Sequence, residues 1–335
     1  MSDPLVCVCI PCYNNALTIA QTLHSIVSQS YPNLLIKVFD NASSDTTRDV
    51  VQGFIDQDSR IQLFTRESTV SLEDNFNTCI AAAEGEFAAI FHSDDVYEHS
   101  IIAVQLDFLL RHPEAVAVST HASLIDENDT ATGLRMVPPE LADQKESVLD
   151  RFSLINLCFK YGNFVTCPSV LFRTPILKNH IQRFNRQAFK SAADFNVWFR
   201  LTEQGMFGFI NQPLMRYRVS AVSFSFNLAR ARIDDHDYFL VLDDAIENGG
   251  FSEQQSTQLV RYRRFLLMKD RANTNLNRVI LGHRDFQPVA LLRNAGLIFE
   301  SRFHTKFFVL ALFSRLLTML PQSNWLAGLV KRVKF

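Results

Sequence analysis

The first 120 residues alternate between short apolar runs and longer stretches in which apolar residues recur every three or four positions. A short run bounded by polar residues predicts a buried strand, and the longer spacing predicts a helix with one buried face. The expected strands are 5–10, 34–39, 61–64, 87–91 and 116–119, and the expected helices are 18–29, 45–55, 71–83 and 101–110. Regular alternation of this kind predicts an α/β fold, in which helices flank a mainly parallel, Rossmann-like sheet.

Polar residues follow three of these strands directly. Ligands of open parallel sheets bind beyond the carboxyl ends of the strands, so we expect the three clusters to meet at one edge. The clusters are Pro11-Cys12-Tyr13-Asn14, Asp40-Asn41-Ala42-Ser43 and His92-Ser93-Asp94-Asp95.

Two acidic features of this sequence carry more than one interpretation. Adjacent carboxylates such as Asp94 and Asp95 repel each other, and a hard divalent cation binds such oxygens well. The alternative is a pair that caps the start of the segment 96–102. Similarly, Asp194 opens an amphipathic helix expected at 194–201, where a lone Asp is usually a cap. The residues themselves leave both choices open.

The remainder of the chain is less regular. Residues 120–215 show little periodicity apart from a possible hairpin around Glu127-Asn128-Asp129, and residues 228–300 have a helical, charged pattern. In the last segment, the apolar run 307–320 has two helical faces. Ser314, Arg315, Thr318 and Gln322 lie on one face, and Phe308, Leu312, Leu316 and Met319 lie on the other.

A basic tail follows this run, since residues 300–335 hold six Lys and Arg against one Glu. An amphipathic, basic helix with a Trp is typical of a segment that lies in the plane of an anionic membrane surface. The alternative is a helix packed on the protein's own core. No segment supplies the ~20 apolar residues of a membrane-spanning helix.

The composition supports a folded protein with two differently charged halves. The chain has 335 residues, of which 47% are hydrophobic and 20% charged, which excludes extended disorder. Residues 1–150 hold 23 acidic and 7 basic side chains (net −16), whereas residues 151–335 hold 12 acidic and 26 basic ones (net +14). The two halves could attract each other, or the basic half could face an anionic surface or substrate. A near-neutral total of −2 argues against nucleic acid as a partner.

Cysteine usage and the N-terminus predict a reducing, cytoplasmic location. Six cysteines are present, three of them in or beside the first apolar run, and we expect buried, reduced thiols. The N-terminal residues lack the basic region and long apolar run of a secretory signal. The phosphate loops G-x-G-x-x-G and G-x-x-x-x-G-K-[ST] and the hydrolase elbow G-x-S-x-G are all absent.

Six segments, taken in order, carry a resemblance to a known family. They read VCIPCYNN at 8–15, SQSYPN at 28–33, VFDNASSD at 38–45, AEGEF followed by FHSDD between 83 and 95, ADFNVWFRL at 193–201 and PLMRYR at 213–218. In this order and spacing the chain resembles the family-2 inverting glycosyltransferases with the GT-A fold.

The resemblance implies roles for the residues that match. Tyr13 would stack on the nucleobase, and Asp40 with Asn41 would bind the base or ribose. Asp94 would ligate Mn²⁺ or Mg²⁺ at the diphosphate, with Asp95 as the next candidate ligand. Asp194 would be the general base. Pro11, Asn14, His92 and Ser93 complete the implied nucleotide-sugar site.

The implied chemistry suits these residue types. The departing nucleoside diphosphate gains negative charge, which a divalent cation stabilises. The acceptor hydroxyl attacks from the opposite side and loses its proton to a carboxylate, so the anomeric centre inverts. The donor would be UDP-, GDP- or dTDP-linked, and the acceptor a glycan or lipid-linked glycan of a cell-surface polysaccharide. The enzyme would work at the cytoplasmic face of the membrane as a peripheral protein.

Three positions depart from the family pattern. His92 stands where the first Asp of the metal motif is usual, Ala193 replaces a Glu before the proposed base, and Ser220 replaces a His. The competing hypothesis is therefore a nucleotide-sugar- or glycan-binding protein with impaired catalysis. A nucleotidyltransferase on a related sheet lacks its Gly-rich loop here. The expected organisation is a catalytic domain at 1–225, a helical extension at 226–300 and an amphipathic basic segment at 301–335.

Overall fold

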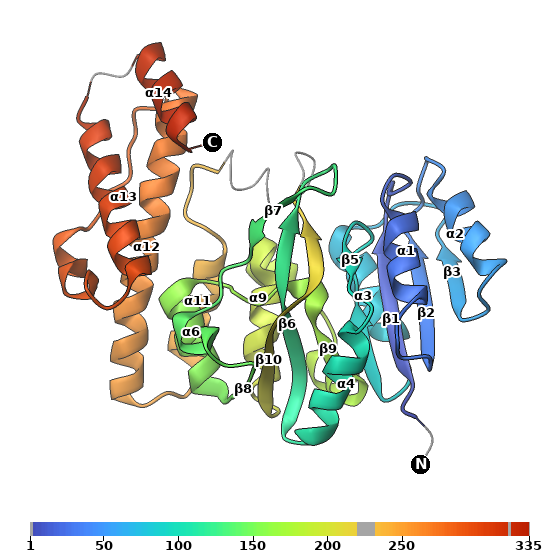
Figure 1. Ribbon diagram of the computed structural model, residues 1–335. Coiled ribbons are helices and arrows are strands. Elements are labelled where there is room, and N and C mark those ends of the chain that lie inside the picture. Colours follow the sequence, from blue (N-terminus) through green and yellow to red (C-terminus); the bar gives the residue numbers. More distant parts are fainter. Residues whose placement is uncertain (1–2, 220–231, 321–322, 335) are drawn as a thin grey trace. The chain divides into compact units, whose positions relative to one another are not determined.

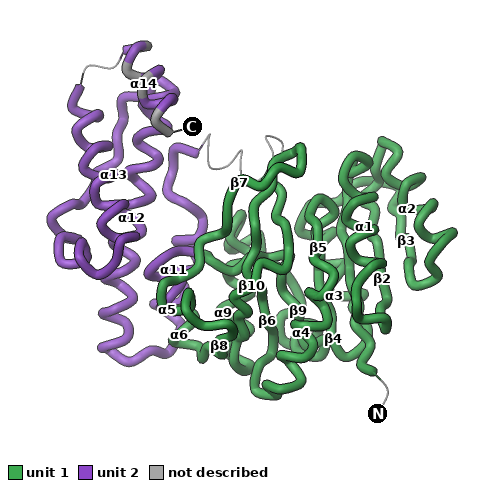
Figure 2. Tube along the Cα trace, viewed as in Figure 1, with its two compact units in different colours: residues 1–155, 163–219 green, residues 156–162, 220–335 purple. Residues whose placement is uncertain are grey.

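The computed structural model describes residues 3–219, 232–320 and 323–334 (Figure 1). The chain forms two compact units (Figure 2). Unit 1 contains residues 1–155 and 163–219, and unit 2 contains residues 156–162 and 220–335. Ser220, one of the departures from the family pattern, and Gln322 of the C-terminal segment lie outside the described residues. The three-part division expected from the sequence stays a prediction.

Unit 1 is built on a sheet whose first four strands are parallel neighbours in the order β3-β2-β1-β4. A short antiparallel strand, β9, then joins β4 to β6, and β6 pairs in parallel with β10. The strands are β1 (Val6–Cys12), β2 (Leu34–Asp40), β3 (Ile61–Thr65), β4 (Phe87–Ile90), β5 (Val96–Tyr97), β6 (Ala115–Ile125), β7 (Ala131–Leu134), β8 (Glu146–Leu149), β9 (Leu171–Arg173) and β10 (Met206–Arg218). The predicted α/β class with a mainly parallel central sheet flanked by helices is confirmed.

The local sequence explains the elements nearest the site. All seven residues of β1 are buried, because a parallel strand covered on both faces needs apolar side chains on both sides. Helices alternate with the first strands, and Ser71 caps α3 by accepting a hydrogen bond from the Asp74 amide. The helices between these strands are α1 (Ile19–Val27), α2 (Thr47–Ile55), α3 (Leu72–Ala82) and α4 (Ile101–Arg111).

The predicted hairpin is present between β6 and β7. Asp126 organises its turn, because one carboxylate oxygen accepts hydrogen bonds from the amides of Asn128 (2.8 Å) and Thr130 (2.9 Å). Asp129 adopts a positive φ of 65°, a conformation that Asp tolerates better than most residues. The hairpin brings Leu134 and the residues that follow it beside β6.

The rest of unit 1 is irregular and contains short helices. Among them, α9 (Ala193–Leu201) carries Asp194 in its first turn. Trp198 of α9 is fully buried near the rings of Phe172 and Phe207, so α9 is anchored in the core of the unit. The other helices are α5 (Pro139–Ala142), α6 (Arg151–Tyr161), whose last residues belong to unit 2, α7 (Thr174–Ile176) and α8 (Arg186–Phe189).

Unit 2 is helical in its described parts, as the charged pattern predicts. The 29-residue α12 (Glu253–Leu281) begins with a capping box at Ser252 and ends at Gly282, whose φ of 78° closes the helix. An ion pair between Arg232 and the buried Asp270 joins the segment before α11 to α12. The other helices are α11 (Tyr238–Asn248), α13 (Arg302–Thr318) and α14 (Asn324–Lys334).

Helix α13 buries a polar residue and exposes a row of apolar ones. Ser314 is fully buried, and its hydroxyl donates a hydrogen bond to the Ala272 carbonyl of α12 at 3.0 Å. The opposite row is exposed, with 45% of Leu312, 55% of Leu316 and 67% of Met319 accessible to solvent. The described helices include none with the length and apolar character needed to cross a bilayer.

Candidate functional site

The three polar clusters found in the sequence lie at one edge of the unit 1 sheet. In the parallel register Cys12 of β1 is opposite Asp40 of β2, and the Asn41 amide donates a hydrogen bond to the Cys12 carbonyl at 2.9 Å. On the other side of β1, the Phe91 amide, directly after β4, bonds to the Cys9 carbonyl at 2.9 Å. Adjacent strand ends therefore bring the clusters together.

The loop after β1 is hydrogen-bonded to both neighbouring clusters. The Asn15 side-chain oxygen accepts from the Tyr13 amide and from the Ser93 hydroxyl, each at 2.9 Å. Asn14, with a positive φ of 52°, accepts from the Ser44 amide at 2.9 Å through its side chain. These bonds fix the loop but leave the Tyr13 side chain 50% exposed, while Pro11 is buried in the strand.

Asp40 and Asn41 already have partners within the protein. The buried Asp40 carboxylate accepts from the Arg48 guanidinium at 2.6 Å and from the Ser43 amide at 3.1 Å. The Asn41 side chain bonds to both the carbonyl and the amide of Val70. Both residues thus shape the edge of the sheet, and their contacts to a nucleobase or ribose stay predictions.

His92, Asp94 and Asp95 form a cluster whose potential ligand atoms all lie within 4.8 Å of one another. Asp95 accepts a hydrogen bond from the Arg218 amide through Oδ1 at 2.8 Å. Its Oδ2 and the Nε2 atom of His92 are buried and have no hydrogen-bond partner among the described residues. Orphaned buried acceptors of this kind need an explanation, and a divalent cation suits their carboxylate and imidazole atoms.

The electrostatics of this cluster also favour a cation. Burial, and then the charge of Asp94, raises the pKa of Asp95 well above its usual range. Burial lowers the pKa of His92, which keeps the imidazole neutral and able to donate a lone pair. A positive ion at this place would offset the repulsion between the two carboxylates. The cluster therefore fits the predicted metal site, and the identity of the ion stays open.

Arg218, the last residue of β10, is hydrogen-bonded to this cluster. Its side chain is buried and donates through Nε to the Asp94 carbonyl at 2.8 Å and through Nη1 to the Asp126 carbonyl at 2.9 Å. Its Nη2 atom reaches Gln21 of α1 and Asp129 of the hairpin turn, both at 2.7 Å. One guanidinium thus ties the acidic loop to a helix and to the β6–β7 turn.

Asp194 is not the cap of its helix. The N-cap position is Ala192, and no side chain caps the helix there. The half-buried Asp194 carboxylate accepts a hydrogen bond from the Asn163 side chain at 3.3 Å. Burial raises its pKa, although the Phe195 amide, the charge of Arg135 and the Asn163 hydrogen bond oppose this effect. A carboxylate with a raised pKa is a better proton acceptor near neutral pH.

Cys167 connects Asp194 with the acidic cluster. Burial raises the pKa of its thiol well above the usual range, and the negative charges of Asp194 and Asp95 raise it further. The charges of two carboxylates that are 99 positions apart in the sequence thus act on the same thiol.

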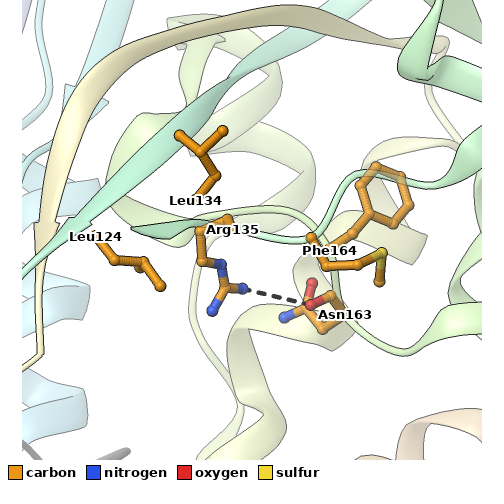
Figure 3. A pocket seen from close by; sticks show the side chains of 6 residues that line it. Leu124, Leu134, Arg135, Asn163 and Phe164 are labelled. Atoms are coloured by element: carbon orange, nitrogen blue, oxygen red, sulfur yellow. Dashed lines mark hydrogen bonds between the residues drawn. The ribbon is translucent and has the colours of Figure 1, made fainter. Parts of the chain in front are cut away.

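A pocket of about 260 Å³ opens beside Asn163 and so near Asp194 (Figure 3). Sequence reasoning missed it, because its residues come from the hairpin and from a loop without periodicity. No spacing rule links those segments. The lining residues are Leu124, Leu134, Arg135, Met136, Asn163 and Phe164.

Comparison with known proteins gives consistent results for sequence and fold. The model of the family described as glycosyl transferase family 2 matches residues 7–181. A UDP-Glc:alpha-D-GlcNAc-diphosphoundecaprenol beta-1,3-glucosyltransferase, WfgD of Escherichia coli, is 27% identical over 74% of this chain and 89% of its own length. The putative teichuronic acid biosynthesis glycosyltransferase TuaG of Bacillus subtilis is 24% identical over 68% of this chain and 84% of its own length.

Solved structures share the fold at low sequence identity. Residues 1–349 of S. aureus TarS, in complex with UDP-GlcNAc, align with a TM-score of 0.61 and 15% identity over 93% of this chain and 91% of that one. The mannosyltransferase PcManGT from Pyrobaculum calidifontis, in complex with GDP-Man and Mn²⁺, aligns with a TM-score of 0.58 and 17% identity. That alignment covers 96% of this chain and 89% of the other.

Proposed function

Since the chain belongs to glycosyl transferase family 2, we propose that it moves a sugar, with inversion, from a nucleotide-sugar donor to a hydroxyl of a glycan or lipid-linked glycan. Two relatives support this proposal. The name of WfgD gives it a lipid diphosphate-linked acceptor, and the name of TuaG places it in teichuronic acid synthesis. The proposal extends to cell-surface polysaccharide synthesis for the same reason.

The observation that carries the proposal is the cluster of His92, Asp94 and Asp95 beyond the end of β4, whose potential ligand atoms lie within 4.8 Å of one another. In this assignment Asp194 accepts the proton of the attacking hydroxyl, and Asn163 holds its carboxylate in place at 3.3 Å. The exposed ring of Tyr13 offers a face on which a nucleobase could stack. A retaining mechanism would need a nucleophilic carboxylate, whereas one base suffices for a single inverting displacement.

Asp94, Asp95 and His92 are the residues that would hold Mn²⁺ or Mg²⁺. When bound, the ion would supply positive charge that stabilises the departing diphosphate. Arg218 supports this arrangement, because it fixes the backbone of Asp94 and one carboxylate oxygen of Asp95. His92 stands where the family motif usually has its first Asp. Because an imidazole ligand suits transition metals better than Mg²⁺, we expect Mn²⁺ to bind more tightly than Mg²⁺.

Calorimetry with UDP, GDP and dTDP, each with and without Mn²⁺, tests the donor site. We expect one nucleotide to bind in a metal-dependent way to the wild type and to Asp194→Asn, but not to Asp94→Asn. Transfer should fall by roughly 10²- to 10⁴-fold in Asp194→Asn, since a general base contributes about that much. Asp107→Asn, on the exposed side of α4, is the matched control and should behave as the wild type. Equal loss of binding and transfer in Asp194→Asn would refute the base assignment.

Because His92 replaces the first Asp of the usual metal motif, a second function is considered, that of a nucleotide-sugar-binding protein with impaired catalysis. The same titrations separate the two functions. Metal-dependent binding of a nucleotide without transfer, across neutral and lipid-linked acceptors, would favour the binding protein.

We also propose that α13 of unit 2 docks on an anionic membrane surface. Its exposed row of Leu312, Leu316 and Met319 would otherwise contact water, and the exposed Arg302 and Arg315 lie on the same helix. An apolar row combined with basic side chains matches a lipid interface, in which acyl chains meet anionic headgroups. A peripheral location at the cytoplasmic face of the membrane follows from the proposed lipid-linked acceptor.

Vesicle flotation tests this surface. The triple variant Leu312→Ser, Leu316→Ser and Met319→Ser should lose binding to vesicles with 30% anionic lipid, roughly tenfold or more, because each Leu buries apolar area worth more than ~1 kcal/mol. Leu281→Ser, which is also exposed but lies at the end of α12, is the control. Unchanged flotation of the triple variant would mean that this row faces another partner.

A further inference from the structure

The pocket in the irregular part of unit 1 has a lining of mixed chemistry. Four of its six side chains are apolar, namely Leu124 of β6, Leu134 at the end of β7, and Met136 and Phe164 in the following loops. The other two are Arg135 and Asn163. Its volume of about 260 Å³ lies near the lower end of small-molecule pockets, so it suits part of a larger ligand.

The guanidinium of Arg135 has donors to spare. Among the described residues it makes a single hydrogen bond, to the Asn163 carbonyl at 3.4 Å, and no ion pair (Figure 3). Its planar group lies 5.8 Å from the centre of the Tyr217 ring, which holds it in place from one side. A guanidinium carries five N–H groups in a fork that matches phosphate and carboxylate oxygens.

The pocket is also directly connected to the proposed base. Asn163 lines the pocket and donates its side-chain N–H to the Asp194 carboxylate at 3.3 Å. Arg135 lies near enough to Asp194 for its charge to lower the pKa of that carboxyl. A molecule that fills the pocket therefore lies next to the group that takes the acceptor's proton.

We propose that this pocket binds the acceptor, and that it selects an acceptor whose sugar is linked through phosphate to an apolar chain. Arg135 binds the phosphate, and Leu134, Met136 and Phe164 contact the first carbons of the chain. This inference rests on the proposed transferase function and adds the place where a lipid-linked acceptor binds and the residues that would hold its phosphate and chain. The shared chemistry of a phosphate could also come from a soluble sugar phosphate, and the experiment separates the two sources.

The test is calorimetry on the full chain with its donor site filled by Mn²⁺ and by whichever of UDP, GDP and dTDP binds in the titrations described above. The probes are decyl diphosphate, inorganic pyrophosphate and decyl maltoside. We expect decyl diphosphate to bind at least tenfold more tightly than either of the other two. Arg135→Gln should weaken that binding about 10- to 100-fold, the range for a lost hydrogen bond to a charged group, and Arg135→Lys should recover part of it.

Two further variants complete the design. Leu134→Ser changes a side chain that is 60% exposed, so the fold should persist while the preference for decyl diphosphate over pyrophosphate falls. Arg111→Gln removes an exposed arginine from α4 of the same unit and should leave all three affinities unchanged.

The outcomes are distinct. Failure of every nucleotide to bind refutes the proposed function before the pocket is tested. If the nucleotide binds but Arg135→Gln holds decyl diphosphate within twofold of the wild type, the pocket is not the anion site. Equal binding of pyrophosphate and decyl diphosphate would assign the pocket to a soluble phosphate and overturn the apolar part of the proposal.

Discussion

Replacing Arg218 by Lys should loosen the acidic loop while keeping the positive charge. In the wild type, the guanidinium reaches the carbonyls of Asp94 and Asp126 through two different nitrogens, 2.8 and 2.9 Å away. A lysine ammonium is a single point and cannot take up both positions. At least one part-buried carbonyl then loses its donor, whereas the exposed carboxylate of Asp129 can turn to water.

The magnitude follows from these contacts. A polar group left without a partner inside the protein costs about 1–3 kcal/mol, so the loss of one carbonyl's donor should lower the free energy of unfolding of unit 1 by about 1–3 kcal/mol, and the loss of both by about 2–6 kcal/mol. Arg216 on the same strand is the matched control, since its bond to Glu98 joins side chains that are each 42% exposed. Arg216→Lys should cost less than ~1 kcal/mol.

Urea unfolding followed by tryptophan fluorescence measures both variants. The chain has two tryptophans, and in a Trp325→Phe background only the fully buried Trp198 of unit 1 reports. Arg218→Lys should also weaken metal-dependent nucleotide binding roughly tenfold or more, as loss of support behind a metal ligand typically does. The reasoning is refuted if Arg218→Lys and Arg216→Lys agree within about 0.5 kcal/mol, less than one lost buried hydrogen bond.

Three other predictions use the same purified protein. Gly208→Ala should destabilise unit 1 by about 1–3 kcal/mol in the same urea titration, because its methyl group would overlap a buried phenylalanine ring. Asp270→Asn should cost unit 2 about 3 kcal/mol and lower hydrogen-exchange protection in α12, since the largely buried Arg232 side chain loses its counter-charge. Transfer should fall as the pH drops through the raised pKa of Asp194, because only its carboxylate accepts a proton, and Asn163→Ala should move this acid limb to higher pH by removing a bond that lowers the pKa. An acid limb that does not move in Asn163→Ala would argue against this hydrogen bond.

The parallel part of the sheet could be predicted because its physics is local. β1 and β4 are buried on both faces and appear as apolar runs, and the run of β2 is interrupted only by Lys37, so each strand lies within two residues of its expected bounds. β9 gave no such signal. It has only three residues, Leu171–Arg173, and is held antiparallel between β4 and β6 by distant parts of the chain. Periodicity cannot reveal a strand that short.

The candidate site also has one part that the sequence predicts and another part that it does not. The rule that ligands bind beyond parallel strand ends brought the clusters after β1, β2 and β4 together, and the hydrogen bond between Asn15 and Ser93 now joins two of them. Asn163 and Arg135 could not be found by this rule. They meet because the β6–β7 hairpin folds one segment back and the chain after α6 returns to the same place, both of which are tertiary effects.

The C-terminal helix shows a different limit, because periodicity identifies two faces but not which of them is buried. In α13 Ser314 of the polar face is buried and bonds to a carbonyl of α12, Arg315 of the same face is exposed, and the row with Leu312, Leu316 and Met319 is also exposed. Burying three half-exposed side chains in lipid would recover about 1 kcal/mol each, and each nearby basic residue adds about 1 kcal/mol on an anionic surface. Such a sum gives weak, reversible and salt-dependent attachment. Flotation should therefore decline steadily between 50 and 500 mM salt. Binding that does not change with salt would contradict the proposed electrostatic contribution of the basic side chains.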